Sequence, residues 1–177
     1  MDMTEILLLF NTLLVVCLIG LVYLLARYIG DFIGRIQSIR GIEIGSLQID
    51  DNPPSFREFD YNGNKIVSSQ LFKDKKTLLL FVKSTCPICK SILDKLHEIQ
   101  SNYDLNFVII NSDETLDDKT ITDRINDGIV YIKSGKLSQS FSVQSVPHAV
   151  LVNTQSKVDG VGPLKNQKSL VNLLLNA

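Results

Sequence analysis

The stretch that decides the fold is TLLLFVKSTCPICKSILDKL, residues 77–96. Its first part, residues 77–83, is a short apolar run of the kind that lies buried in the middle of a β-sheet. From Cys89 to residue 103, apolar side chains recur at helical spacing. The element Cys86-Pro87-Ile88-Cys89 therefore lies between a predicted buried strand and the first turn of a predicted helix.

This position suits redox chemistry of the two thiols. Two residues between cysteines at the start of a helix bring both sulfurs within reach of a disulfide. The Cys86 sulfur would lie over unpaired N–H groups at the positive end of the helix dipole, and this stabilises a thiolate. Pro87 suits the opening turn, where an N–H would be unpaired anyway. We predict Cys86 and Cys89 as catalytic residues of thiol–disulfide exchange.

Two other interpretations of the cysteine pair stay open, namely a structural zinc site and two inert core thiols. A structural zinc site would need a second pair of ligands, for which His97, His148 and Cys17 are the candidates. The two histidines lie 51 residues apart, which is not a recognisable zinc pattern. We predict no metal site and no cofactor, since Gly160-Val161-Gly162 also lacks the rest of a nucleotide fingerprint.

Composition limits the class of protein further. The 177 residues are 45% apolar and 21% charged, with a net charge of −1. This apolar content supports a packed core and excludes a disordered tail protein. The lack of a basic excess argues against nucleic-acid binding. Three cysteines are too few for a small scaffold held together by disulfides.

A run of 21 residues without a charge, residues 6–26, precedes the domain. As a helix it would be about 31 Å long, close to the thickness of a hydrocarbon core of about 30 Å. No Lys or Arg precedes the run and no Ala-x-Ala follows it, so we predict an uncleaved anchor, with a signal peptide as the alternative. Helical spacing continues to Arg40, which favours a helix that lies along the bilayer surface. Cys17, inside the run, is interpreted as a lipid-facing or packing residue.

The rest of the chain alternates strands and helices. The predicted strands are residues 77–83, 106–111, 128–133, 149–153 and 158–161, with a hairpin at 56–69 around Asn62-Gly63. The predicted helices are residues 89–103, 112–126, 135–141 and 166–175. We therefore predict an α/β fold with a mixed central sheet flanked by helices. The expected division is an anchor with a juxtamembrane helix at 1–40, a linker at 41–53 and one domain at 54–177.

A second element follows the cysteines by some 60 residues, where Val146-Pro147-His148 precedes the run AVLVN. This order resembles the thioredoxin superfamily, in which a cis-proline loop faces the Cys-x-x-Cys and offers backbone to an extended substrate. The resemblance implies a thioredoxin-like fold and makes Val146 and Pro147 the candidate substrate-binding residues. Pro147 is the candidate cis residue, since a cis peptide bond has a low free-energy cost only before proline. An ordinary trans proline at the start of an edge strand is the alternative.

The resemblance can be narrowed. PPSFREFDYNGNKIVSSQLFKDKKTLLLFVKSTCPICK, residues 53–90, is similar to the opening of the TlpA/ResA-type anchored thioredoxins. A closer similarity is to the MauD-type proteins that accompany methylamine dehydrogenase maturation, on the exit LARYIG at 25–30 and the site STCPICK at 84–90. This resemblance implies a membrane-anchored thiol–disulfide oxidoreductase with a protein disulfide or dithiol client and a protein redox partner.

Two departures from ordinary thioredoxins affect the chemistry. Thr85 stands where they have Trp, and Leu80 stands where they have a buried Asp. Without that acid, a water, Lys83 or a substrate group would have to accept the proton of Cys89. The dipeptide between the cysteines tunes the reduction potential over a wide range, so the sequence does not predict the direction of exchange.

The predicted mechanism is attack of the Cys86 thiolate on a client disulfide and resolution of the mixed disulfide by Cys89, or the reverse, in maturation of an extracytoplasmic protein. The main alternative is a membrane-tethered assembly factor or chaperone that binds a client through the same groove, with redox chemistry secondary. A third interpretation, copper delivery by two Cys and a His, lacks the Cys-x-x-x-Cys spacing of copper-chaperone relatives.

The distribution of arginines and the redox chemistry predict opposite sides of the membrane for the domain. Arg27, Arg35 and Arg40 follow the span and none precedes it, which favours a cytoplasmic domain. Stable disulfides belong instead to the oxidising side of the membrane. The similar MauD-type proteins also carry arginines after their span, yet are thought to act outside the cytoplasmic membrane. We predict a single-pass cell-membrane protein with an extracytoplasmic domain.

Overall fold

The computed structural model describes residues 3–40, 47–113, 118–126 and 128–176. Contacts between residues divide the chain into two units, Met1–Gly45 and Ser46–Ala177. Residues 41–46 of the predicted linker (41–53) lie outside the described residues. The predicted boundaries at 40, 53 and 54 therefore stay predictions.

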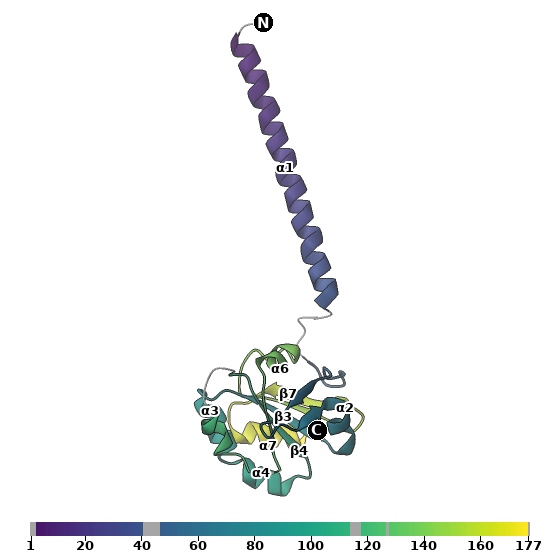
Figure 1. The fold of residues 1–177 in the computed structure, drawn as a ribbon, viewed down its shortest axis with the longest axis vertical. Helices are drawn as coiled ribbons and strands as arrows, with labels where there is room; N and C mark the ends of the chain where they lie inside the picture. The colour runs from purple at the N-terminus through teal and green to yellow at the C-terminus, as the bar shows by residue number, and fades with distance from the viewer. Residues whose placement is uncertain (1–2, 41–46, 114–117, 127, 177) are drawn as a thin grey trace. The chain divides into compact units, whose positions relative to one another are not determined.

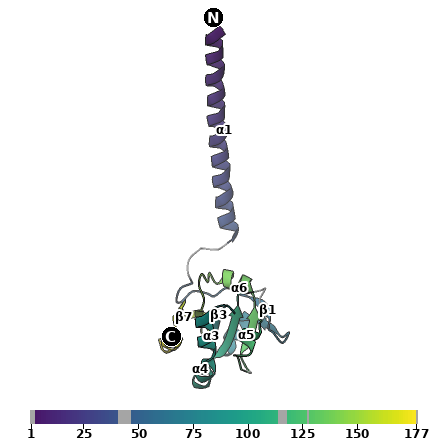
Figure 2. The same cartoon turned by 90° about the vertical axis from the view of Figure 1, so that its left-hand side faces the viewer.

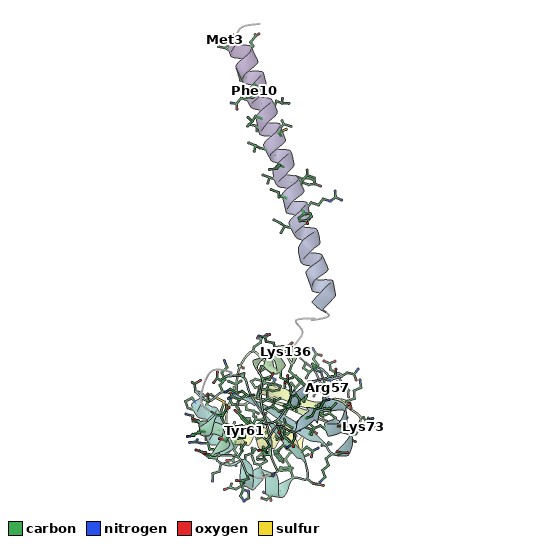
Figure 3. All side chains as sticks on the ribbon, viewed as in Figure 1. Met3, Phe10, Arg57, Tyr61, Lys73 and Lys136 are labelled. Carbon is green, nitrogen blue, oxygen red and sulfur yellow. A yellow bond between two sulfur atoms is a disulfide. The ribbon has the colours of Figure 1, made fainter. Side chains whose placement is uncertain are left out.

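The described residues of the first unit form one helix, α1 (Met3–Arg40) (Figure 1). Within it, Met3–Ile29 is long and apolar enough to cross a membrane, and a signal sequence would pass the same test of length and composition. Its described side chains are exposed, including Phe10 at 64% (Figure 3). The helix continues to Arg40 as predicted. The side chains of residues 30–40 lie outside the described part of the helix. That this end of α1 lies along the bilayer surface therefore stays a prediction.

The second unit is built on a five-stranded sheet with the order β5-β4-β3-β6-β7. The strands are β3 (Thr77–Val82), β4 (Asn106–Asn111), β5 (Val130–Lys133), β6 (His148–Val152) and β7 (Val158–Pro163). β3, β4 and β5 run parallel, whereas β6 is antiparallel to both β3 and β7. All six residues of the central strand β3 are buried, as expected for an apolar strand covered on both faces. The predicted mixed sheet is confirmed.

Helices cover both faces of this sheet (Figures 1 and 2). Alternate side chains of a strand point to opposite faces, so Leu80 and Phe81 enter two different apolar clusters. The Leu80 cluster includes residues of α3 (Pro87–Leu93), α4 (Leu96–Asn102), α5 (Lys119–Thr122) and α7 (Gln167–Leu175). The Phe81 cluster includes residues of α2 (Ser68–Asp74) and α6 (Gly135–Ser140). Each face thus has its own core.

The predicted helix at 89–103 is wrong in its continuity, because it is split into α3 and α4. At the junction the N–H of Lys95 donates to the carbonyl of Ile92, three residues back, instead of four. This tighter turn interrupts the helix between α3 and α4. α3 and α4 still follow one another along the same side of the sheet (Figure 2).

The predicted helix at 112–126 is also wrong, since its described part holds only the single turn α5 (Lys119–Thr122). Side-chain hydrogen bonds explain why this segment is not an amphipathic helix. The Asp118 carboxylate accepts hydrogen bonds from the Tyr131 hydroxyl at 2.7 Å and from Lys133 Nζ at 3.2 Å. Asp118 is thus tied to β5 instead of facing solvent. Residues 114–117 of the prediction lie outside the described residues.

The segment before β3 makes backbone hydrogen bonds to both edge strands of the sheet. A hairpin of β1 (Arg57–Phe59) and β2 (Lys65–Val67) forms as predicted, with Gly63 at a φ of +82°. Next to it, the N–H of Tyr61 donates to the Tyr131 carbonyl of edge strand β5 at 2.9 Å. At the opposite edge, Val158 of β7 exchanges two backbone hydrogen bonds with residues 50 and 51, at 2.8 and 3.0 Å. One stretch of about a dozen residues therefore reaches both edge strands.

Candidate active site

The cysteines lie at the carboxyl end of the central strand. β3 ends at Val82, and the chain turns through residues 83–86 into α3, whose N-cap is Cys86. The backbone of this turn is held by a hydrogen bond from the Cys86 N–H to the Lys83 carbonyl at 3.1 Å. Pro87 occupies the first helical turn, where its missing N–H costs no hydrogen bond. Strand, turn and helix thus fix the position of Cys86.

The two sulfurs differ in access to solvent. Cys86 and Cys89 form a disulfide, with their Cα atoms 5.2 Å apart. The Cys89 side chain is fully buried in the Leu80 cluster, whereas Cys86 is half-buried. Ile88, between them, is 45% exposed and widens the apolar surface beside Cys86. An incoming thiol or disulfide can therefore approach Cys86 but not Cys89.

The environment of Cys86 favours a thiolate. Its Sγ accepts a hydrogen bond from the Cys89 N–H at 3.1 Å, which is the capping bond of α3. Hydrogen bonds from backbone N–H groups stabilise the charged form of a thiol, and the positive end of the helix adds to this. The same hydrogen bond holds the Cys86 sulfur at the N-terminus of α3.

A second segment meets Cys86 from across the site. The Val146–Pro147 peptide bond is cis, as the resemblance implied for Pro147, and Pro147 is buried. The Val146 carbonyl oxygen lies 3.9 Å from Cys86 Sγ, although the two residues are 60 positions apart. The Pro147 carbonyl is occupied, since it accepts the N–H of Leu164 at 2.8 Å. The structure thus brings together Cys86, Cys89, Val146 and Pro147.

Leu80 supplies no carboxylate at the position where ordinary thioredoxins have a buried acid. Its side chain is fully buried in the same apolar cluster as Cys89. Lys83 stands exposed at the end of β3. Transfer of the Cys89 proton to Lys83, to water or to a substrate group stays a prediction.

Sequence reasoning missed Asp113, which supports the turn that carries the cysteines. Its Oδ2 accepts hydrogen bonds from the N–H of Ser84 at 3.1 Å and from the Ser84 hydroxyl at 2.8 Å. Ser84 is only 6% exposed. A signal was present, because Asp113 follows strand β4, and the carboxyl ends of neighbouring parallel strands meet at one edge of a sheet.

The two histidines have separate settings. His148 begins β6 opposite Phe81 of β3, and burial lowers its pKa from the ordinary value of 6.5. His97 lies on α4, where its Nδ1 is 2.6 Å from the side-chain nitrogen of Asn126. Among the described residues, no three His, Cys, Asp or Glu side chains gather as metal ligands would.

The fold and the motif agree with a known family. A thioredoxin-like family model matches residues 74–158, which include both cysteines and Pro147. The domain has a thioredoxin-like fold. The expected thioredoxin-like fold is therefore confirmed, and the match begins just before β3 and ends at the first residue of β7.

The thioredoxin-like domain has MauD proteins among its relatives. The chain is 23% identical over 127 residues to methylamine utilization protein MauD of Methylophilus methylotrophus, and the match covers 67% of this chain and 60% of that protein. It is 24% identical over 128 residues to MauD of Paracoccus denitrificans, over 71% and 64% of the two chains. For MauD of Methylorubrum extorquens the identity is 23% over 172 residues, and the match covers 93% and 83%. The chain thus spans less than two thirds of the first two relatives.

Solved structures share the fold. The thioredoxin domain of a thiol-disulfide oxidoreductase from Bacteroides vulgatus superposes with a TM-score of 0.58 at 17% identity, over 74% of this chain and 100% of that one. A thio-disulfide isomerase from Thermus thermophilus gives a TM-score of 0.59 at 16% identity, over 73% and 96% of the chains. At such identities the likeness establishes the fold alone.

Proposed function

We propose that the chain is a membrane-anchored thiol–disulfide oxidoreductase that exchanges disulfides with protein clients through Cys86 and Cys89. The observation that carries the proposal is the asymmetry of the pair. Cys86 is half-buried, caps α3 and accepts an N–H hydrogen bond, whereas Cys89 is fully buried beneath it. An accessible nucleophile above a protected resolving thiol is the arrangement that disulfide exchange needs.

The reaction balances without a cofactor. The Cys86 thiolate attacks one sulfur of a client disulfide, and the other client sulfur leaves as a thiolate. Cys89 loses its proton and attacks Cys86 Sγ, which expels the first client sulfur and forms the Cys86–Cys89 disulfide. The client gains two electrons and the Cys89 proton, its second thiolate takes a proton from water, and a protein redox partner returns the pair to the dithiol. The reverse sequence oxidises a client dithiol.

In this proposal Val146 and Pro147 form the substrate-binding loop. The Val146 carbonyl, 3.9 Å from Cys86 Sγ, lies where the backbone of an extended client segment would run past the sulfur. The Pro147 carbonyl is occupied within the domain, so the main-chain contacts fall to Val146. A disulfide-bonded client would thus dock beside the cis bond with its sulfur toward Cys86.

A titration of the full chain in a non-ionic detergent tests this function. The protein is equilibrated with reduced and oxidised glutathione, and its free thiols are counted by alkylation and mass spectrometry. We expect a single two-electron transition that Cys86→Ser and Cys89→Ser each abolish. Cys17→Ser is the matched control and leaves the transition unchanged, since Cys17 lies in α1. Persistence of the transition in Cys86→Ser would refute the proposal.

The potential also gives the direction of exchange. A value near that of thioredoxin, about −270 mV, would favour a reductase, whereas a value near −120 mV would favour an oxidase. Client maturation that survives the double change of Cys86 and Cys89 to serine would favour an assembly factor that binds its client without redox chemistry.

We further propose that the domain lies outside the cytoplasm, because stable disulfides belong to an oxidising compartment and an anchored exchanger has clients there. Three arginines at 27, 35 and 40 argue for the opposite side. Fusion of alkaline phosphatase after Ala177 tests the two. Activity of that fusion, with a dark cytoplasm-dependent fluorescent reporter at the same point, is expected, and the opposite pattern would refute the placement.

A further inference from the structure

A polar cavity of about 320 Å³ lies beside the cis-proline loop. We call it the Ser138 pocket, and its wall comes from four segments of the domain. They are Lys83 after β3, Ser112 after β4, Gly135, Ser138 and Gln139 of α6, and residues 143–146 before Pro147. Three of these segments follow the parallel strands β3, β4 and β5, so the pocket lies at the carboxyl edge of the sheet, where α/β folds bind ligands.

Two residues of the pocket wall also hold Cys86. The Lys83 carbonyl accepts the N–H of Cys86, and the Val146 carbonyl lies 3.9 Å from its sulfur. The inference rests on the proposed function, in which a client is joined to Cys86 by a mixed disulfide. The client residues next to that sulfur would then lie along Val146, at the mouth of the pocket.

Ser138 gives the pocket an unused hydrogen-bonding group. The residue is 8% exposed, and its Oγ has no hydrogen-bond partner among the residues that the structure describes. Ser112 differs, because its hydroxyl donates to the Val82 carbonyl at 3.2 Å. Buried hydroxyls are nearly always paired, so an unpaired one in a pocket wall leaves room for a partner that a ligand or water supplies.

The charge of the pocket selects the kind of ligand. Lys83 is the only charged residue among the described residues of the wall, and it is exposed. Asp113 follows Ser112 in the chain, but its Oδ2 is already occupied by the N–H and hydroxyl of Ser84. An ammonium group and an unpaired hydroxyl, with no carboxylate among the described residues of the wall, favour a negatively charged acceptor.

We propose that the Ser138 pocket binds an acidic side chain next to the reactive cysteine of the client. Lys83 Nζ would pair with the carboxylate, and the Ser138 hydroxyl would donate to one of its oxygens. The oxidoreductase would therefore prefer client disulfides flanked by Asp or Glu over those flanked by neutral or basic residues. The preference acts on docking and leaves the sulfur chemistry unchanged.

Peptide disulfides test this preference directly. The reduced full chain in a non-ionic detergent is mixed with terminally blocked peptide disulfides that carry Asp, Asn or Lys beside the cysteine. Each rate is divided by the rate of the same peptide with dithiothreitol, which removes the effect of the neighbour on the peptide sulfur itself. We expect the Asp peptide to react at least about threefold faster than the Lys peptide, as for an exposed ion pair. At about 1 M salt, where the Debye length is about 3 Å, this ratio falls toward one.

Three variants separate the pocket from a general charge effect. Lys83→Glu should invert the ratio of Asp to Lys peptide, whereas the matched control Lys73→Glu, an exposed lysine of α2, should leave it unchanged. Ser138→Ala should slow the Asp and Asn peptides relative to the Lys peptide, by up to about tenfold for the charged acceptor. Its thermal unfolding temperature should not fall, because the lost hydroxyl has no partner within the described domain.

The outcomes distinguish the inference from the proposed function. Equal normalised rates for the three peptides, or an equal response to Lys83→Glu and Lys73→Glu, would overturn the pocket while leaving exchange at Cys86 intact. A Ser138→Ala variant that loses stability would assign the hydroxyl a structural role and would also overturn it. No reaction with any peptide would refute the exchange itself, and the pocket with it.

Discussion

Asp113→Ala is the substitution whose cost the structure defines best. It removes a carboxylate oxygen that accepts two hydrogen bonds, from the N–H and the hydroxyl of Ser84 at 3.1 and 2.8 Å. Hydrogen bonds to a charged group contribute about 1.5–3 kcal/mol each, and a buried donor without a partner is costly. Because Asp113 itself is only half-buried, we take the lower end and expect a loss of about 3 kcal/mol in the free energy of unfolding.

The assay is thermal unfolding of the full chain in detergent, followed by the near-ultraviolet circular dichroism of its tyrosines. For a unit of about 130 residues, 3 kcal/mol lowers the unfolding temperature by about 10 °C. Asp113→Asn keeps one acceptor oxygen and should lose about half as much. Asp123→Ala, an exposed aspartate after α5, is the matched control and should change stability by less than about 0.5 kcal/mol.

A double-mutant cycle decides whether the loss comes from the pair. Ser84→Ala and Asp113→Ala should be coupled by about 1–2 kcal/mol, since both remove the bond between the Ser84 hydroxyl and Asp113, whereas the backbone bond is lost only in Asp113→Ala. The rate of disulfide exchange should fall in both variants, because the turn between β3 and Cys86 loses its support. A loss below about 1 kcal/mol for Asp113→Ala, or additive single effects, would refute the reasoning.

Three further predictions use the same unfolding assay. Asn166→Ala removes the capping box of α7, in which Asn166 and Ser169 bond each other's backbone N–H at 3.0 Å, and should cost about 1 kcal/mol. Tyr131→Phe removes the hydroxyl that donates to Asp118 and accepts from the buried Asn111, and should cost about 1–2 kcal/mol. Burial lowers the pKa of His148 from 6.5, so the unfolded chain binds the proton first, and stability should fall as the pH drops below 6.5. His148→Asn should remove that part of the pH dependence, which cannot exceed about 1.4 kcal/mol per pH unit.

A different outcome would contradict each of these three predictions. An α7 cap variant as stable as the parent would mean that packing of the helix alone sets its start. A Tyr131→Phe variant that gains stability would show that Asn111 finds another partner. A His148→Asn variant with the same loss of stability at low pH as the parent would assign that loss to other groups.

The sequence predicted the centre of the fold better than its connections. Strand β4 lies at residues 106–111 as expected, because a continuous apolar run between polar residues has few other solutions in a sheet. The break between α3 and α4 left no mark in the pattern, since Leu93 and Leu96 keep helical spacing across it. Only the change of hydrogen bonding at Lys95 shows it.

The same contrast holds for the candidate site. Cys86 and Cys89 stood out because their spacing within one short segment carries chemical meaning by itself. Pro147 needed the resemblance to a family, since nothing local to it points at a sulfur 60 residues earlier. Asp113 and Ser138 were missed altogether, because an aspartate after a strand and a serine in a short helix are ordinary on their own. Their meaning comes from neighbours that only the folded chain supplies.

The stretch that reaches both edges of the sheet has a consequence for self-association. Exposed strand edges pair with other chains, and here β5 and β7 each form backbone hydrogen bonds with residues 50–61, at Tyr131 and Val158. Detachment or truncation of this one stretch would leave both edge strands of the same molecule without these backbone partners. Each such chain could then pair with neighbours through β5 and through β7. Association through two different surfaces can continue without closing, and it can produce open-ended polymers.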